Sequence, residues 1–185
     1  MTKFYTQTGD DGYTGFLGEG RLPKHAPRIE AIGDLDEATA ALGVARAACQ
    51  LPQTAEILMA AQRDLYHVMA EVAATPENAS RFRSINSQRV TWLEEWTDSI
   101  SRQVSLPKDF ILPGDSQPGA ALALARTIVR RAERRVAGLL HQADIENPEL
   151  LRYLDRLSSL CFVLELQENQ AAGKSLPTLA KKIDF

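Results

Sequence analysis

The stretch "RIEAIGDLDEATAALGVARAAC", Arg28–Cys49, carries its larger apolar side chains at the spacing of an amphipathic helix. Pro27 stands directly before it, where the first turn of a helix accepts proline, and Pro52 follows shortly after its end. The apolar face contains Ile29, Ile32, Leu35, Leu42 and Ala45. This pattern predicts a helix of about six turns with one buried face.

Four further stretches repeat this period, and each is bounded by residues that start or stop helices. They cover residues 54–74, 88–104, 118–141 and 148–173. Ser116 or Gln117 can cap the third of them and Asn147 the fourth, which Gly173 can end. The polar residues 76–87 predict a loop.

These elements predict the fold class. Five helices, few strand signals and short connections are typical of an all-α five-helix bundle. We expect residues 1–185 to form a single domain, with the bundle over residues 27–173 and an irregular tail over residues 174–185.

The composition restricts the class of protein. It is 44% apolar and 24% charged, as in ordinary globular proteins, and a net charge of −3 argues against nucleic acid as a partner. No apolar run reaches the length of a membrane helix, and the first residues lack the pattern of a signal peptide. The two cysteines and three histidines are scattered, so we expect no protein-bound zinc or haem and a reducing cytoplasm as the location.

Five arginines lie within "ARTIVRRAERR", residues 125–135. Arg126, Arg130 and Arg134 recur every four residues and share a helix face, and Arg131 and Arg135 form a neighbouring pair at the same spacing. Such a cluster is either a solvated basic face or a site for planar, multidentate recognition of a polyphosphate or of a partner's carboxylates. Both interpretations are open from this helix alone.

Two other features also allow two interpretations. The segment "TQTGDDGYTG", Thr6–Gly15, is either a surface turn or a backbone cradle for an anion. Asp36 falls on or beside the apolar face of its helix, so it is either half exposed at the edge or paired with a cation. Arg126 is a candidate for that cation, within the chain or across an interface.

Five motifs follow one another between about Thr6 and Glu168. They are "YTQTGDDGYT", "GRLPKHAPRIEAIGDLDE", "FILPGD", "ARTIVRRAERR" and "NPELLRYLDRLSSLCFVL". In this order and spacing they resemble the PduO-type ATP:cob(I)alamin adenosyltransferases. The resemblance implies a homotrimer of five-helix bundles with active sites between neighbouring subunits.

The resemblance also implies a reaction. Members of the family transfer the 5′-deoxyadenosyl group of ATP to the cobalt of a reduced corrinoid, cob(I)alamin, and release triphosphate. Cobalt(I) is the nucleophile, so the site needs no general base. We expect Mg²⁺ to accompany the triphosphate and a separate electron donor to reduce cob(II)alamin.

Roles for particular residues follow from the same resemblance. Within residues 1–25, the nucleotide-binding loop, the expected ATP contacts are Thr6, Gln7, Thr8, Gly9, Thr14, Gly15 and Lys24. On the helices they are Arg130, Arg131, Ala132, Glu133, Arg134 and Asp155. Asp36 and Arg126 would pair across the subunit interface, and Phe110 would occupy the lower face of the corrin and displace its axial base. No metal is assigned to protein side chains.

The chain departs from the family pattern at Gln7, Asp115, Asp155 and Ser159, where the family has Lys, Gly, Asn and Asp. The Asp155 carboxylate would cost roughly 3 kcal/mol about 5 Å from a phosphate charge at an effective dielectric of about 20. Two alternatives to the enzyme therefore stay open. One is a non-catalytic paralogue that binds nucleotide or corrinoid as a sensor or carrier, and the other is a helical scaffold whose arginine face binds an acidic protein.

Overall fold

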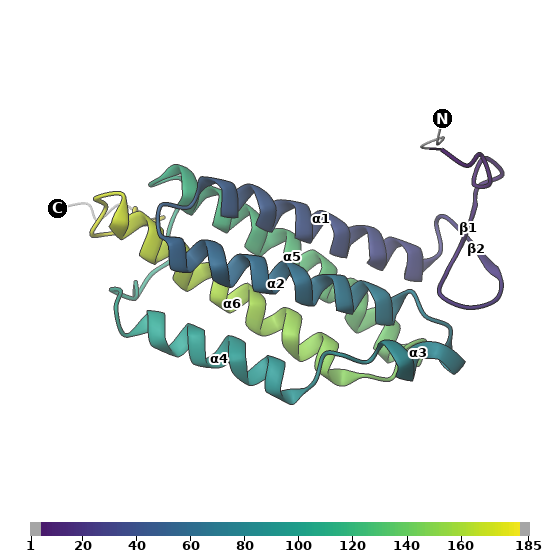
Figure 1. The fold of residues 1–185 in the computed structure, drawn as a ribbon. Helices are drawn as coiled ribbons and strands as arrows, with labels where there is room; N and C mark the ends of the chain where they lie inside the picture. Colours follow the sequence, from purple (N-terminus) through teal and green to yellow (C-terminus); the bar gives the residue numbers. More distant parts are fainter. Residues whose placement is uncertain (1–4, 182–185) are drawn as a thin grey trace.

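The computed structural model describes residues 5–181, and these are mostly helical (Figure 1). The long helices form over the stretches that the apolar period predicts. In chain order the elements are β1 (Tyr13–Gly15), β2 (Arg21–Pro23), α1 (Pro27–Ala48), α2 (Pro52–Val72), α3 (Pro76–Phe82), α4 (Ser87–Ser101), α5 (Gln117–His141) and α6 (Pro148–Ala171). The all-α prediction is therefore confirmed at the level of the elements.

The helix ends show why the start and stop signals were informative. The Ser116 side chain accepts a hydrogen bond from Gly119 N at 3.0 Å and caps α5. The Asn147 side chain accepts one from Glu149 N at 3.1 Å and caps α6. Gly173, just beyond α6, has a φ of +86°, the left-handed conformation that glycine adopts most easily after a helix.

Two short elements correct the predictions. Residues 76–82 of the predicted loop form α3, so residues 5–181 contain six helices instead of five. Pro76 starts α3, but none of its residues is buried, and a helix without a buried face leaves no apolar period to read. The N-terminal loop contains a two-stranded antiparallel ribbon in which Thr14 pairs with Leu22.

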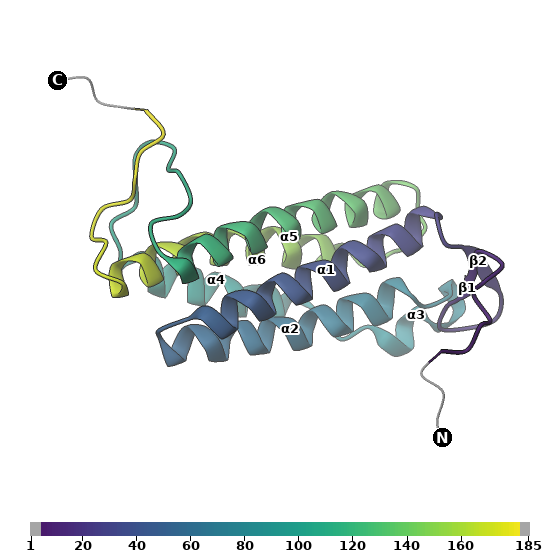
Figure 2. The same cartoon turned by 90° about the horizontal axis from the view of Figure 1, so that it is seen from above.

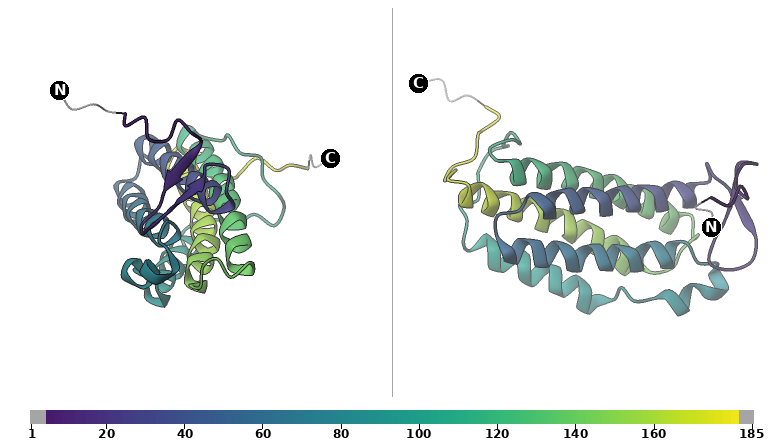
Figure 3. Two further views of the ribbon diagram at one scale, coloured as in Figure 1. Left: turned by 90° about the vertical axis from the view of Figure 1, so that its right-hand side faces the viewer. Right: turned by 45° about the horizontal axis from the view of Figure 1, so that its top comes forward.

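The bundle core lies between α1, α2, α5 and α6, with α4 packed on α6 (Figures 1 and 3). Helix α1 packs against α2 and α5, and α6 packs against α4 and α5. Leu35, Leu65, Leu93, Val129 and Leu157 are buried and come from the five long helices. Full burial of a Leu or Val side chain is worth about 1.5–3 kcal/mol, so this shared core holds the helices together.

The β1–β2 ribbon and the C-terminal segment lie at opposite ends of the bundle (Figures 1 and 2). Helix α1 runs between these ends, and its 22 residues span about 33 Å. At the far end, Ile111 of the loop between α4 and α5 and Leu179 of the tail form an isolated antiparallel bridge, although the tail was expected to be irregular. The last part of that predicted tail, residues 182–185, lies outside the described residues.

No helix within residues 5–181 is both long enough and apolar enough to cross a lipid bilayer.

Candidate functional site

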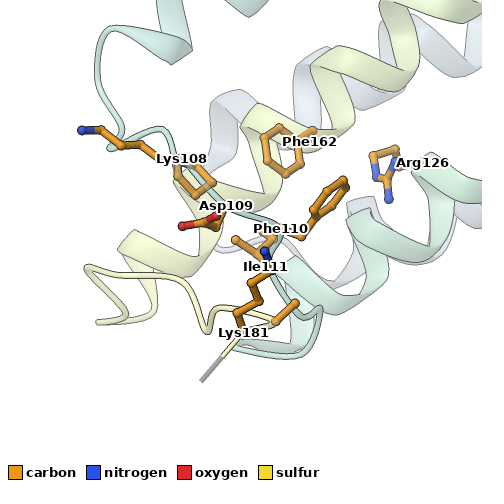
Figure 4. Close-up of a pocket in the computed structure, with 9 residues that line it drawn as sticks. Lys108, Asp109, Phe110, Ile111, Arg126, Phe162 and Lys181 are labelled. Carbon is orange, nitrogen blue, oxygen red and sulfur yellow. The ribbon is translucent and has the colours of Figure 1, made fainter. Parts of the chain in front are cut away.

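An open pocket lies where the loop between α4 and α5 meets both α5 and α6. Its volume is about 560 Å³, and its lining includes Phe110 from the loop, Arg126 from α5 and Phe162 from α6 (Figure 4). Phe110 is 87% exposed. A phenylalanine ring displayed beside a second ring and a guanidinium is a surface suited to a flat, partly apolar ligand.

The arginine face of α5 begins at this pocket. Arg126 lines the pocket, whereas Arg130 and Arg134 are exposed further along the same face. With a rise of 1.5 Å per residue, Arg126 and Arg134 are about 12 Å apart along the helix axis. The three arginines therefore form a cationic row that leads from the pocket along α5.

Arg131 and Arg135 have a different role, because they face α1. Arg131 Nε donates to Asp34 Oδ1 at 3.1 Å, and Arg135 Nε donates to Asp34 Oδ2 at 3.2 Å. Arg131 also pairs with Glu37, and Arg135 lies 3.4 Å from Glu30. These two arginines join α5 to α1, and the expected contact of Arg131 with ATP stays a prediction.

The Asp36 carboxylate and the Arg126 guanidinium do not pair within residues 5–181. Asp36 is exposed on α1, whereas Arg126 is half buried and its Nε has no hydrogen-bond partner in the part of the chain that the structure describes. A buried donor without a partner costs about 1–3 kcal/mol. The pairing within one chain is therefore not seen, and the pairing across an interface stays a prediction.

Asp155 lies on α6 opposite Glu133 of α5. Burial raises the pKa of Glu133, and the nearby Asp155 charge raises it further, while Arg130 and Arg134 oppose the shift. Arg156 pairs with Asp155 and also donates to Glu94 Oε1 at 2.9 Å. Arg156 thus offsets part of the negative charge at Asp155.

Ala132 was also expected to contact ATP. It is fully buried in the core, on the face of α5 opposite the arginine row, and its contact with ATP stays a prediction.

The N-terminal segment is a fixed turn with a lysine folded over it. Arg21 donates to Asp11 at 2.7 and 2.8 Å and to Thr8 O at 2.5 Å, which closes the turn. A Cβ placed on Gly9 would lie 3.0 Å from Lys24 Nζ, so this ammonium group packs against the glycine. The predicted loop residues and Lys24 are therefore together.

The remaining loop residues have ordinary turn contacts. The Thr6 and Thr8 hydroxyls are 2.8 Å apart, and Gln7 has a φ of +61°, which is uncommon for a residue other than glycine. Thr14 and Gly15 lie on β1. The whole segment is at the end of the bundle remote from the α4–α5 loop (Figure 2), and that loop carries Phe110, so one chain does not bring the two predicted parts of the site together.

Sequence reasoning missed Phe162 and Glu165, which both lie on α6. Glu165 is 2% exposed, and its Oε1 has no hydrogen-bond partner among residues 5–181. Burial raises the pKa of Glu165 to about 7, although the positive charge of Arg126 acts in the opposite direction. The sequence did contain a signal for Glu165. This acidic residue follows Cys161 by four positions, the helical spacing that places it on an apolar face.

Metal ligands do not cluster in the described chain. Within residues 5–181, no group of three or more His, Cys, Asp or Glu side chains could hold a metal ion. The site offers guanidinium and ammonium groups, which suit an anion.

These features define a class of helical-bundle proteins with a row of arginines next to an open aromatic pocket. The chain belongs to the cobalamin adenosyltransferase family, whose model matches residues 4–168. It is 38% identical over 172 residues to the corrinoid adenosyltransferase PduO of Citrobacter freundii, a match that covers 92% of this chain and 51% of that protein. The chain spans about half the length of this relative and of the PduO protein of Salmonella typhimurium.

Other similar proteins match over most of their length. The corrinoid adenosyltransferase of Bacillus subtilis is 36% identical over 176 residues, which cover 92% of this chain and 89% of that protein. A solved structure of a phenylalanine-to-alanine variant of the PduO-type ATP:corrinoid adenosyltransferase from Lactobacillus reuteri, complexed with cobalamin and ATP, has a TM-score of 0.88 and 31% identity. That match covers 97% of this chain and 100% of the other.

Proposed function

We propose that the chain transfers the 5′-deoxyadenosyl group of ATP to the cobalt of a reduced corrinoid and releases triphosphate. The observation that carries this proposal is the position of Arg126. It lies at once in the pocket beside Phe110 and at the inner end of the cationic row of α5. A triphosphate along Arg130 and Arg134 would therefore direct the ribose of ATP toward the pocket, where the corrin ring would lie.

The chemistry requires little proton transfer from the protein. Cobalt(I) supplies the electron pair that forms the cobalt–carbon bond, while the bond from C5′ to oxygen breaks and its electron pair leaves with the triphosphate. Arg130 and Arg134 would stabilise the charge that develops on this leaving group. Phe110 would cover the lower face of the corrin and exclude water and the axial base from cobalt.

Mg²⁺ would come with the triphosphate, since the described residues form no metal-binding cluster of their own. It would neutralise part of the phosphate charge. A separate electron donor would reduce cob(II)alamin, and a reducing cytoplasm would suit that step. The two cysteines are free, and burial raises the pKa of both Cys49 and Cys161 to about 12, so neither thiol is suited to serve as that donor.

We also propose that the active site lies between subunits of a homotrimer. The N-terminal loop with the β1–β2 ribbon and the α4–α5 loop, which lines the pocket, are at opposite ends of a bundle whose α1 alone spans about 33 Å. ATP cannot bridge that span while its C5′ contacts cobalt. The loop of one subunit would therefore complete the pocket of its neighbour, with Asp36 pairing with Arg126 across the interface.

The experiment is an anaerobic incubation of the protein with ATP, Mg²⁺ and chemically reduced cobalamin. The expected result is the absorbance change of a cobalt–carbon product, with one triphosphate released for each corrinoid adenosylated. A chain that binds ATP and cobalamin without forming this product would be the sensor or carrier, the alternative that Asp155 favours. Binding of neither ATP nor cobalamin would contradict both the enzyme and the sensor or carrier. The protein-binding scaffold would then be the remaining alternative.

A further inference from the structure

The loop that carries Phe110 depends on the C-terminal segment for its position. Residues 174–181, which we call the strap, run beside this loop (Figure 2). Leu112 N donates to Thr178 O at 2.8 Å, and Ala180 N donates to Phe110 O at 2.8 Å. The backbone of Phe110 is thus held by a segment about 70 residues further along the chain.

A carboxylate fastens the strap to the bundle. Thr178 N donates to Asp115 Oδ2 at 2.9 Å, and Thr178 Oγ1 donates to Asp115 Oδ1 at 2.6 Å. Both carboxylate oxygens therefore accept hydrogen bonds from one residue. The Thr178 hydroxyl is the main reason that the pKa of Asp115 is lowered, so the carboxylate stays ionised and the hydrogen bonds are charge-assisted.

Asp115 is well placed to transmit rigidity from the bundle to the strap. It directly precedes Ser116, the N-cap of α5, and Ser116 Oγ donates to Asn169 Oδ1 on α6 at 2.6 Å. Thr178 is thereby connected through Asp115 to the start of α5 and to the last turns of α6. At its first residue the strap is also held to α6, because Lys174 N donates to Asn169 O at 2.9 Å.

The strap also forms part of the pocket. Ala180 and Lys181 line it together with Phe110 and Arg126. If the strap separated from the loop, the pocket would lose this wall, and Phe110 would lose the hydrogen bond to its carbonyl. Arg130 and Arg134, by contrast, do not line the pocket and would keep their surroundings.

We infer that the pair formed by Asp115 and Thr178 is a latch that positions Phe110 and the strap for corrinoid binding. Asp115 is a positioning residue in this scheme, and it acts on the corrinoid and not on ATP. The inference rests on the proposed function. It also gives a role to one of the positions where the chain departs from the family pattern, since a glycine at residue 115 could not accept these hydrogen bonds.

The first test needs no substrate. In Asp115→Ala, hydrogen exchange at the amides of Leu112 and Ala180 should become about tenfold faster, because the strap opens more often. Thr178→Val should show a smaller change in the same direction, since it keeps one of the two hydrogen bonds. Asp98→Ala and Thr91→Val, both at exposed positions on α4, are matched controls with unchanged exchange at these amides.

The second test measures ligand affinity. In Asp115→Ala, the Kd for cob(II)alamin should rise about tenfold if the competent arrangement falls to about a tenth of the molecules, and the Kd for ATP should stay within about twofold. A double variant that combines Asp115→Ala with Thr178→Val should bind cob(II)alamin no more weakly than Asp115→Ala alone. Once Asp115 is replaced, the Thr178 hydroxyl has already lost its hydrogen bond to that carboxylate.

Unchanged exchange in Asp115→Ala would overturn the latch. Faster exchange with an unchanged Kd for cob(II)alamin would overturn its positioning role and leave the proposed function standing. If the unaltered chain bound no cob(II)alamin, the proposed function itself would fail, and the exchange rates would still show whether the latch exists.

Discussion

Arg131 donates from Nε to Asp34 Oδ1 at 3.1 Å, and this ion pair joins α5 to α1. It divides the arginines of α5 into two groups with different surroundings. Arg131 and Arg135 are held by carboxylates of α1, whereas Arg130 and Arg134 keep their guanidinium groups on the exposed face. An anionic ligand would therefore contact Arg130 and Arg134.

Arg130→Ala should therefore weaken ATP binding by about 1.5–3 kcal/mol, the usual value of a hydrogen bond to a charged group. Arg135→Ala is the matched control and should change ATP binding little. Its exposed ion pairs are worth about 0–1 kcal/mol each, so its effect should appear as a small loss of stability. Calorimetric titration with ATP and thermal unfolding measure the two quantities. Equal, small effects on ATP binding would mean that the row is only a solvated face.

Asp155→Asn should tighten ATP binding, because it removes an anion without a change in volume. We expect about a tenfold lower Kd, or ~1.4 kcal/mol, since Arg156 already offsets much of the repulsion. Titrations at two salt concentrations with Mg²⁺ held constant would show the difference shrinking as salt rises. An unchanged Kd would show that Asp155 does not face the phosphates.

Glu165→Gln should remove a dependence of stability on pH. Burial raises the pKa of Glu165 from 4.5 to about 7, with Arg126 opposing the shift and Asp115 adding to it. The folded chain therefore binds a proton more tightly than the unfolded chain. As pH rises from about 4.5 to 7, the unaltered protein should lose up to roughly 3 kcal/mol at this site.

The comparison is made by denaturant unfolding at pH 5 and pH 8. Glu165→Gln should be clearly the more stable protein at pH 8 and close to the unaltered protein at pH 5. A difference between the two proteins that is the same at both pH values would contradict the assignment.

Asp36→Arg should dissociate the proposed trimer, because it would place two cations together at the interface. Removing one partner of a desolvated ion pair costs about 3–5 kcal/mol, and a like charge adds to this cost. Sedimentation at micromolar concentration measures the assembly state. Glu56→Arg, an exposed site on α2, changes the charge equally and should leave the assembly intact. Retention of the trimer in Asp36→Arg would rule out the Asp36–Arg126 contact.

Local signals in the chain were enough to place the helices. Pro27, Ser116 and Asn147 begin or cap the helices they were expected to, because an amphipathic period and a capping residue act over only a few neighbours. The sharing of one face by Arg126, Arg130 and Arg134 follows from helix geometry in the same way. α3 escaped detection because it buries no residue and so imposes no period on its sequence.

Tertiary packing decided the remaining features, and each of them joins residues distant in the chain. Arg131 and Asp34 are 97 positions apart, so no local pattern could show that carboxylates of α1 would pair with two of the five arginines. Thr178 and Asp115 are 63 positions apart, and their contact depends on how the strap returns along the Phe110 loop. The separation of Lys24 from Phe110 is likewise a property of the bundle. Lys24 precedes the start of α1 and Phe110 precedes the start of α5; these two helices are antiparallel, and each has more than 20 residues, so their first residues are about 30 Å apart.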